Sequence, residues 1–277
     1  MAFVLSLAMV AGLVPAMSGG ANKVQAASGS GTEPSVSAYA TKTQLMDGTF
    51  APNADGTAVN YGKIVFGKKS DGTTAQEWYI LGKDEGVSGD NTIIFAASPI
   101  ATGQVFSSSD NNKPFNSSFG VYASNPLEVY KNHYGASDLR VALQGMATNT
   151  SYFTTAEQGL MNATTVTTKD TKNSATYTTT DKLYALQGDY KNDKKLWAGT
   201  SDSTVLAMDS YWSSGAGFWL RSPYDDYASS ALLANPGDIV FDYSVYYGIA
   251  VQPASNLNLS SVLFASAATA ASSDTVS

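Results

Sequence analysis

The sequence predicts an α+β fold in which short antiparallel strands come from both ends of the chain, with two or three helices between them. Runs rich in β-branched and aromatic residues occur over 61–97 and again over 218–252. Apolar residues at helical spacing occur between them, over 137–161. We therefore expect strands from the two ends of the chain to share one sheet.

Length and composition allow a folded core and exclude several classes of function. The 277 residues suffice for one large domain or two small ones, and 43% of them are hydrophobic. The net charge of -7, without a basic stripe, argues against a nucleic-acid partner. Cysteine is absent, which excludes disulfides, thiolate metal sites and cysteine nucleophiles.

The chain begins with a segment typical of secretion. Residues 2–17 are apolar, and small residues up to Ala26 resemble a cleavage site. Pro15 interrupts the apolar run, which is shorter than a membrane span requires, so no span is expected in the mature chain. We predict a signal peptide over 1–26, a linker over 27–58, one domain over 59–264 and a disordered tail over 265–277.

The first strands are predicted over 61–67 and 77–82, which form a hairpin with Asp71-Gly72 in the connecting turn. A third strand over 91–97 is continuously apolar, which is typical of a strand buried on both faces. The segment 127–134 does not favour either helix or strand.

Two helices follow. Ser137 is a candidate N-cap for a helix with Leu139, Leu143 and Met146 on its apolar face. A second helix is expected to start at Thr154 or Thr155, because Thr154 and Glu157 have the spacing of a capping box.

The second half of the chain is predicted to be rich in strands. Residues 163–181 suit a surface loop or an extended β-ribbon, 182–186 a short strand, and 189–197 a short helix or turn that buries Trp197. Four further strands are predicted over 218–221, 230–234, 239–243 and 248–252, with a turn at Asn235-Pro236-Gly237-Asp238.

Four motifs in order carry a family resemblance. They are E-W-Y-I-L at 77–81, S-D-L-R with L-Q at 137–144, F-W-L-R-S-P at 218–223 and G-I-A-V-Q-P-A at 248–254. Together they resemble an uncharacterised domain of secreted proteins of Gram-positive gut bacteria. More distantly, the chain is similar to C-type-lectin-like folds, including the formylglycine-generating-enzyme branch and variable proteins diversified by retroelements.

The resemblance implies a C-type-lectin-like mixed fold. The chain departs from the pattern at Gln252, where the family usually has arginine, and at Ala142 and Gln144, where tryptophan and asparagine are common. A site that depends on an arginine at position 252 is therefore not expected. A formylglycine-generating activity is not expected either, because in that family it needs active-site cysteines.

Several conspicuous side chains are interpreted as scaffold. Trp78 and Trp219 lie inside apolar strands, which favours core packing over stacking on a sugar; Trp212 is a third candidate for stacking. We expect Arg140 and Arg221 to bond carbonyls or carboxylates and tie helix to sheet, although either could clamp an anion. The single histidine, His133, is expected to be structural or solvated.

The segment 224–247 is the candidate binding surface. Tyrosine offers a large contact area at little entropic cost, and small polar neighbours supply hydrogen bonds. An ordinary polar β-surface is the alternative. We expect one exposed patch formed by Tyr224, Asp225, Asp226, Tyr227, Ser229, Asp242, Tyr243, Ser244, Tyr246 and Tyr247. The resemblance to retroelement-diversified proteins implies that these positions vary.

The predicted function is a secreted or cell-surface module that binds an unknown protein or glycan, without enzymatic activity. Asp225, Asp226, Asp238 and Asp242 could bind calcium or act as paired carboxylates in glycan hydrolysis, but the calcium motifs of C-type lectins are absent. We predict no metal, no cofactor and no catalytic residues. A structural module without a ligand is the main alternative, and a glycan hydrolase is a weaker one.

Overall fold

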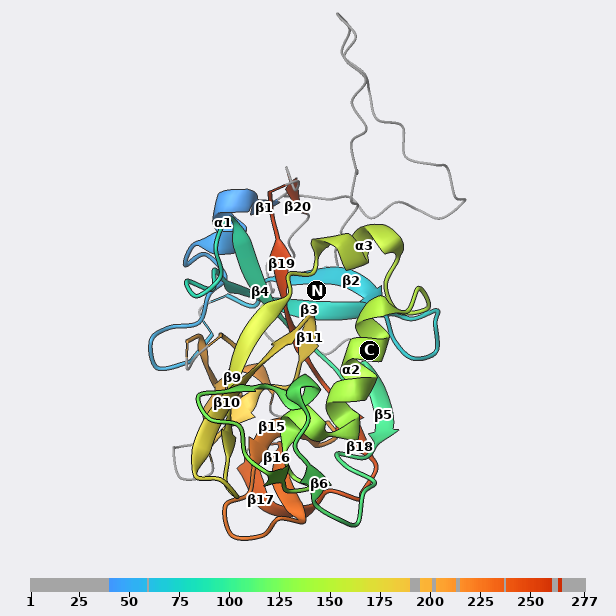
Figure 1. The fold of residues 1–277 in the computed structure, drawn as a ribbon. Coiled ribbons are helices and arrows are strands. Elements are labelled where there is room, and N and C mark those ends of the chain that lie inside the picture. Colours follow the sequence, from blue (N-terminus) through green and yellow to red (C-terminus); the bar gives the residue numbers. More distant parts are fainter. Residues whose placement is uncertain are drawn as a thin grey trace, which may run out of the picture.

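The computed structural model describes residues 40–58, 60–189, 195–200, 203–212, 215–236, 238–260 and 264–265. The predicted signal peptide, the linker up to residue 39 and the tail beyond Ala265 lie outside these ranges. Two five-stranded sheets form the body of the domain, and helices lie between strands from the two ends of the chain (Figure 1). The predicted α+β class with few helices is confirmed.

The first sheet joins strands from the two ends of the chain, as predicted. In spatial order it contains β11 (Leu183–Tyr184), β19 (Ala254–Asn258), β4 (Asn91–Ala96), β3 (Ala75–Gly82) and β2 (Lys63–Lys68). All neighbours are antiparallel. The β2–β3 hairpin is confirmed, and every residue of β4 is buried, as expected of a strand covered on both faces.

The second sheet carries most of the last third of the chain. Its order is β17 (Asp238–Ser244), β16 (Ser230–Asn235), β15 (Phe218–Pro223), β18 (Ile249–Val251) and β5 (Ala101–Gln104). The β15–β18 pair is parallel and the other pairs are antiparallel. All four strands predicted in this part of the chain are therefore present, and β5 and β19 are strands that the sequence did not predict.

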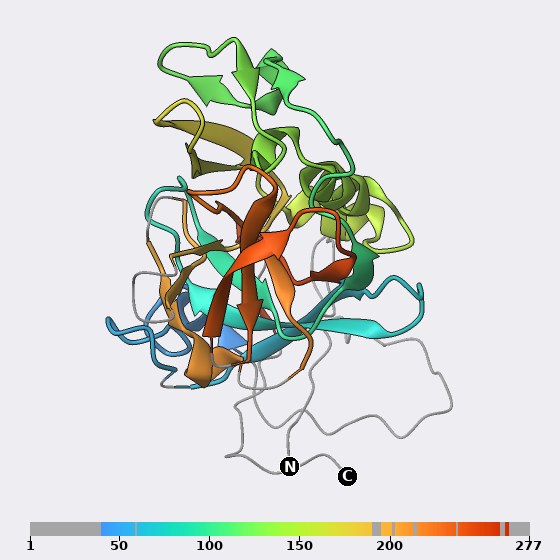
Figure 2. The ribbon, with the colours of Figure 1, turned by 90° about the horizontal axis from the view of Figure 1, so that it is seen from below.

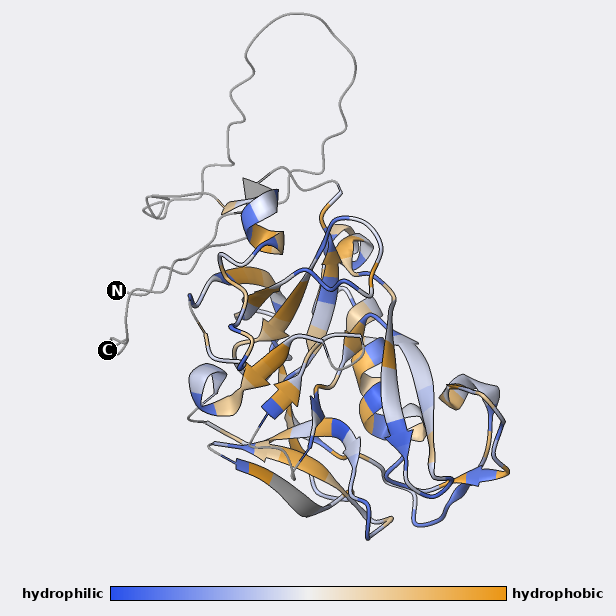
Figure 3. Cartoon of the chain, turned by 90° about the vertical axis from the view of Figure 1, so that its left-hand side faces the viewer, coloured by the Kyte–Doolittle hydropathy of each residue, from blue (hydrophilic) through white to orange (hydrophobic). Residues whose placement is uncertain are grey.

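Side chains alternate across β15 and thereby fill two hydrophobic cores. Trp219 belongs to a core that also contains Trp78, whereas Phe218 and Leu220 belong to a second core. This alternation follows from the two-residue period of a strand. Figure 3 shows the strands of the central sheets coloured largely as hydrophobic. The prediction that Trp78 and Trp219 are core residues is confirmed, since they are 0% and 1% exposed.

The two predicted helices are present and have the predicted caps. In α2 (Asp138–Thr148), the Ser137 side chain accepts a hydrogen bond from the Arg140 N–H. In α3 (Thr155–Leu160), Thr154 and Glu157 form a capping box. The remaining helical segments are α1 (Lys42–Met46), α4 (Met208–Tyr211) and the 3-10 turns η1 (Ser117–Phe119) and η2 (Tyr134–Ala136).

A ribbon of two long strands lies against this body. β9 (Thr164–Asp170) pairs with β10 (Ala175–Asp181) over their full length, and β7 (Val121–Tyr122) extends the ribbon to three strands. Of the two predictions for 163–181, the β-ribbon is the correct one. Short strands complete the fold: β1 (Ala40–Thr41) with β20 (Phe264–Ala265), β6 (Lys113–Pro114) with β8 (Glu128–Val129), and β12 (Gln187–Gly188) with β13 (Lys195–Trp197) and β14 (Val205–Ala207).

Two predictions need correction. Residues 40–58 were predicted as linker, but Leu45 and Phe50 are buried in the core with Trp78, so this segment belongs to the domain. Residues 195–197 form a strand instead of a helix or turn, and Leu196 takes the buried position in place of Trp197. Of the helices within the described ranges, none combines the length and apolar character that a membrane crossing requires.

Candidate functional site

The predicted tyrosine segment forms two adjacent loops at one end of the second sheet. The first loop, 224–229, connects β15 to β16, and the second, 244–248, starts at the last residue of β17 and leads to β18. Ser230 pairs with Ser244, and the Val245 N–H donates to the Ser229 carbonyl at 2.9 Å. The loops therefore lie side by side, at the lower end of the molecule in Figure 1.

The tyrosines of these loops differ in exposure. Tyr227 and Tyr247 are each 58% exposed, whereas Tyr224 is only 7% exposed. The Tyr224 hydroxyl donates to Asp226 Oδ2 at 3.0 Å. Tyr243 is half-buried, with its ring centroid 5.8 Å from that of Trp219 and 5.4 Å from that of Tyr247.

The buried tyrosines anchor the loops to opposite faces of the sheet. Tyr224 belongs to the core of Phe218, whereas Tyr243 and Tyr246 pack against the core of Trp219. The expected single patch of five tyrosines is therefore wrong in this respect, because Tyr224 is buried in one core while Tyr243 and Tyr246 pack against the other. The exposed surface consists of the Tyr227 and Tyr247 rings with Asp225 and Asp226; Ser229 and Ser244 are partly exposed, and the Asp242 side chain lies outside the described structure.

Two consecutive residues that the sequence did not single out hold these loops in place. Asn132 is 1% exposed, and its Nδ2 lies 3.1, 3.2 and 3.0 Å from the carbonyl oxygens of Tyr224, Tyr227 and Ser230. Lys131 Nζ donates to the Tyr246 hydroxyl at 2.6 Å and to the Asp110 carbonyl at 3.0 Å. Nothing in their sequence context marks these residues, because their partners lie far along the chain.

An ion pair connects the first loop to the ribbon. Lys169 Nζ on β9 lies 2.8 Å from both carboxylate oxygens of Asp225. The side chains are 56% and 30% exposed, so the pair contributes little to the stability of the fold. Beside it lies a groove of about 1110 Å³ between the loop 123–126 and the outer face of the ribbon. Figure 2 shows how the excursion over 113–130, in green, projects beyond this ribbon.

His133 lies under the ribbon in a hydrogen-bonded chain. Its ring is 2% exposed and stacks on Tyr177 with a centroid separation of 4.0 Å. Nδ1 accepts the Ala136 N–H at 3.1 Å, so the neutral ring carries its proton on Nε2. Nε2 lies 2.6 Å from the Tyr122 hydroxyl, which donates to Asp170 Oδ2 at 2.5 Å. Of the two roles expected for His133, the structural one is correct.

Burial controls the protonation states of His133 and Tyr122 in this hydrogen-bonded chain. Desolvation lowers the pKa of His133 to about 4, against the opposing effect of the Asp170 carboxylate. Desolvation, together with the hydrogen bond to Asp170, raises the pKa of Tyr122 above its ordinary value of 10.0. Near neutral pH, the His133 imidazole and the Tyr122 phenol are therefore both neutral.

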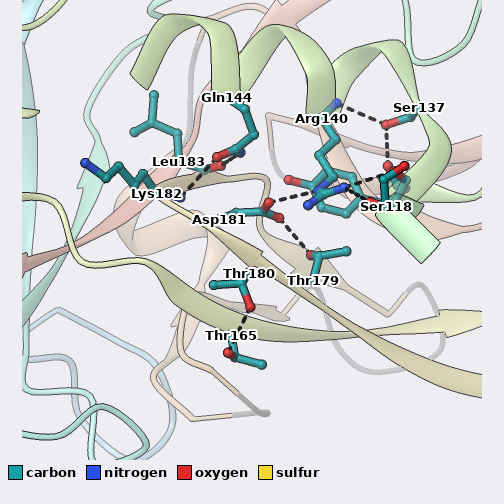
Figure 4. A network of polar contacts seen from close by, with 12 residues as sticks. Ser118, Ser137, Arg140, Gln144, Thr165, Thr179, Thr180, Asp181, Lys182 and Leu183 are labelled. Carbon is teal, nitrogen blue, oxygen red and sulfur yellow. Dashed lines mark hydrogen bonds and ion pairs between the residues drawn. The ribbon is translucent and has the colours of Figure 1, made fainter. Parts of the chain in front are cut away.

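Arg140 and Arg221 have the tying role that the sequence predicted, with different partners. Arg140 Nε on α2 lies 2.8 Å from Asp181 Oδ1 on β10, which joins helix to ribbon (Figure 4). Burial raises the pKa of Asp181, partly offset by Arg140. Arg221 is 0% exposed and donates to the carbonyls of Thr167 and Ala185 at 3.2 and 2.8 Å, so it ties strand to strand instead of helix to sheet.

Gln144 and Gln252, where the resemblance led us to expect other residues, also act as scaffold. Gln144 Nε2 donates to the Leu183 carbonyl at 2.7 Å, as Figure 4 shows. Gln252 is 1% exposed and donates to the Ala96 carbonyl at 2.8 Å. Trp212 is 6% exposed and packs edge-on against Phe218, so it offers no face for stacking on a sugar.

The aspartates considered for calcium are dispersed. Asp225 bonds Lys169, Asp226 accepts from Tyr224, and Asp238 accepts the Ile239 N–H. Within the described ranges, no three acidic or histidine side chains come together as metal ligands. No described site has the geometry from which a metal or a cofactor could be assigned.

The fold and the surface together define a mixed α+β domain whose polar loops and groove are held on a rigid frame. The chain belongs to the family described as a domain of unknown function (DUF6273), whose model matches residues 117–259. The matched region runs from η1 to β19 and includes both loops and the ribbon. Comparison with curated proteins and with solved structures gave no match.

Proposed function

We propose that the domain is a secreted or cell-surface module that binds a ligand on the loops 224–229 and 244–248. One observation carries the proposal: each loop exposes a tyrosine, Tyr227 or Tyr247, and the loops are held in place by hydrogen bonds from Asn132 and Lys131. Pre-organised loops lose little entropy on binding, and exposed tyrosines supply contact area.

The proposal includes a C-type-lectin-like ancestry and variation at the exposed loop positions. Pairing of β19 with β4, which brings strands from the two ends of the chain together, supports the proposed ancestry. The second is tested in the genome, because retroelement diversification requires a nearby near-copy with A-rich codons at these positions.

Binding is tested with an array of purified extracellular protein domains and defined oligosaccharides. Because Tyr243 and Tyr246 are partly buried, the informative variant is Tyr227→Ala with Tyr247→Ala. Loss of two central aromatic contacts is expected to weaken binding at least about tenfold. Val141→Ala with Leu127→Ala, at positions 70% and 94% exposed, is the matched control and should leave binding unchanged.

The same experiment distinguishes the alternative. A purely structural module would show no saturable binding to any member of the array. Saturable binding that the tyrosine variant leaves unchanged would place the ligand elsewhere on the domain and would refute the proposed surface.

A further inference from the structure

The groove beside the ribbon is lined in part by two threonines of the outer face of the ribbon, Thr167 and Thr176. β9 and β10 are in continuous register, with Lys169 opposite Thr176 and Thr167 opposite Thr178. Because side chains alternate along a strand, these residues share the outer face, while Val166 and Tyr177 are buried on the inner face. The ladder therefore fixes the spacing of the outer threonines.

The groove is polar but nearly neutral. Among the described residues that line it, charge is carried only by Lys169 and Asp225, which pair with each other at 2.8 Å. The other polar lining consists of hydroxyl and amide side chains, among them Ser124, Asn125, Thr167, Thr171, Asn173 and Thr176. A polyanion would find no uncompensated cation among these lining residues, and the chain as a whole carries a net charge of -7.

The groove does not suit a peptide added as a further strand. Strand addition needs unpaired N–H and C=O groups along an edge. The floor here is the face of a paired ribbon and presents side chains instead of backbone. Its apolar lining consists of the Tyr122 ring, threonine methyl groups and small residues such as Ala123, Pro126 and Ala175.

We propose that this groove binds an uncharged oligosaccharide. Threonine hydroxyls and amide groups both donate and accept hydrogen bonds, which matches the hydroxyls of a sugar, while threonine methyls can pack against its C–H groups. The volume of about 1110 Å³ exceeds the roughly 300–1,000 Å³ typical of small-molecule pockets, which favours a short chain over a single unit. The site goes beyond the tyrosine loops, although Asp225 borders both.

The test uses an array of uncharged oligosaccharides (glucans, mannans, xylans and chitin fragments) together with sulfated and uronic-acid oligomers. The groove variant is Thr167→Val with Thr176→Val, which removes two lining hydroxyls and keeps their shape. The matched control is Thr165→Val with Thr180→Val, which changes a cross-strand pair of the same ribbon that does not line the groove. Thermal unfolding checks that both variants fold.

At least one uncharged oligosaccharide is expected to bind saturably and independently of salt. The groove variant should bind it at least about tenfold more weakly, and the control should match the parent chain. Failure of every uncharged oligosaccharide to bind, selective binding of the acidic oligomers, or equal losses in both variants would overturn the proposal. Tyr227→Ala with Tyr247→Ala should leave this binding unchanged, so the two proposed surfaces fail separately.

Discussion

The buried histidine predicts a specific acid sensitivity of the fold. In the folded chain, His133 is neutral, with Nδ1 accepting the Ala136 N–H and Nε2 donating to Tyr122. Protonation would break the bond to Ala136 and place a cation in the buried stack with Tyr177. The unfolded chain has no such restriction and takes up a proton near the ordinary pKa of 6.5.

The sign and size follow from the two pKa values. Between pH 6.5 and 4, the unfolded state binds more protons than the folded state, so stability falls as the pH is lowered through this window. The contribution of His133 is fully present above pH 6.5. The difference between about 4 and 6.5 corresponds to a loss of about 3 kcal/mol at the acid end.

Because the chain has a single histidine, the assay is direct. Nitrogen-15 NMR of the imidazole should report the Nε2–H tautomer and a titration midpoint near pH 4. Urea unfolding of the parent chain should lose stability from pH 6.5 to 4, beyond the loss measured for His133→Gln. We expect that variant to be less stable overall, but it has no histidine to titrate. Comparing the pH dependence of stability of the two proteins therefore removes the contribution of the carboxylates. A midpoint near 6.5, an Nδ1–H tautomer or equal slopes would refute the reasoning.

Two further predictions concern the frame. Arg140→Met should lower the free energy of unfolding in urea by about 3 kcal/mol, because it leaves the fully buried Asp181 carboxylate without its ion pair. Recovery of stability in a double variant with Asp181→Asn would identify the charge as the cause. A loss below about 1 kcal/mol would contradict the prediction. Gly135→Ala should destabilise the fold by about 3 kcal/mol or more in thermal unfolding, because the added Cβ would lie 1.7 Å from the Phe119 carbonyl oxygen. The control is Gly145→Ala in α2, where the added Cβ meets open space, and it should be neutral or slightly stabilising.

Features determined by local chemistry could be predicted from the sequence. The caps at Ser137 and Thr154 depend on side chains within three residues, and both form as expected. The placement of Trp219 in the core follows from its apolar strand context. The hairpin β2–β3 follows from its turn and from the composition of its strands.

Features determined by partners far along the chain could not be predicted from the sequence. The parallel pairing of β15 with β18 brings Phe218 beside Ala250 across an intervening hairpin, and no local pattern specifies it. Leu45 and Phe50 sit in a stretch whose small polar neighbours resemble a linker, yet both reach the core. Tyr224 and Tyr227 have similar surroundings in the sequence, but only the fold decides that one is buried and the other exposed.

Three consecutive residues, of which the sequence singles out only His133, connect all the surfaces discussed above. Lys131 bonds Tyr246 in one loop, Asn132 contacts the carbonyls of the other loop, and His133 bonds Tyr122, which lines the groove. Three consecutive side chains thus fix two loops and one wall of the groove to a common backbone. A change at any of them should therefore displace more than one surface, whereas the exposed residues can change without disturbing the frame. Under the proposed function, this separation would let the ligand contacts change while the scaffold stays constant.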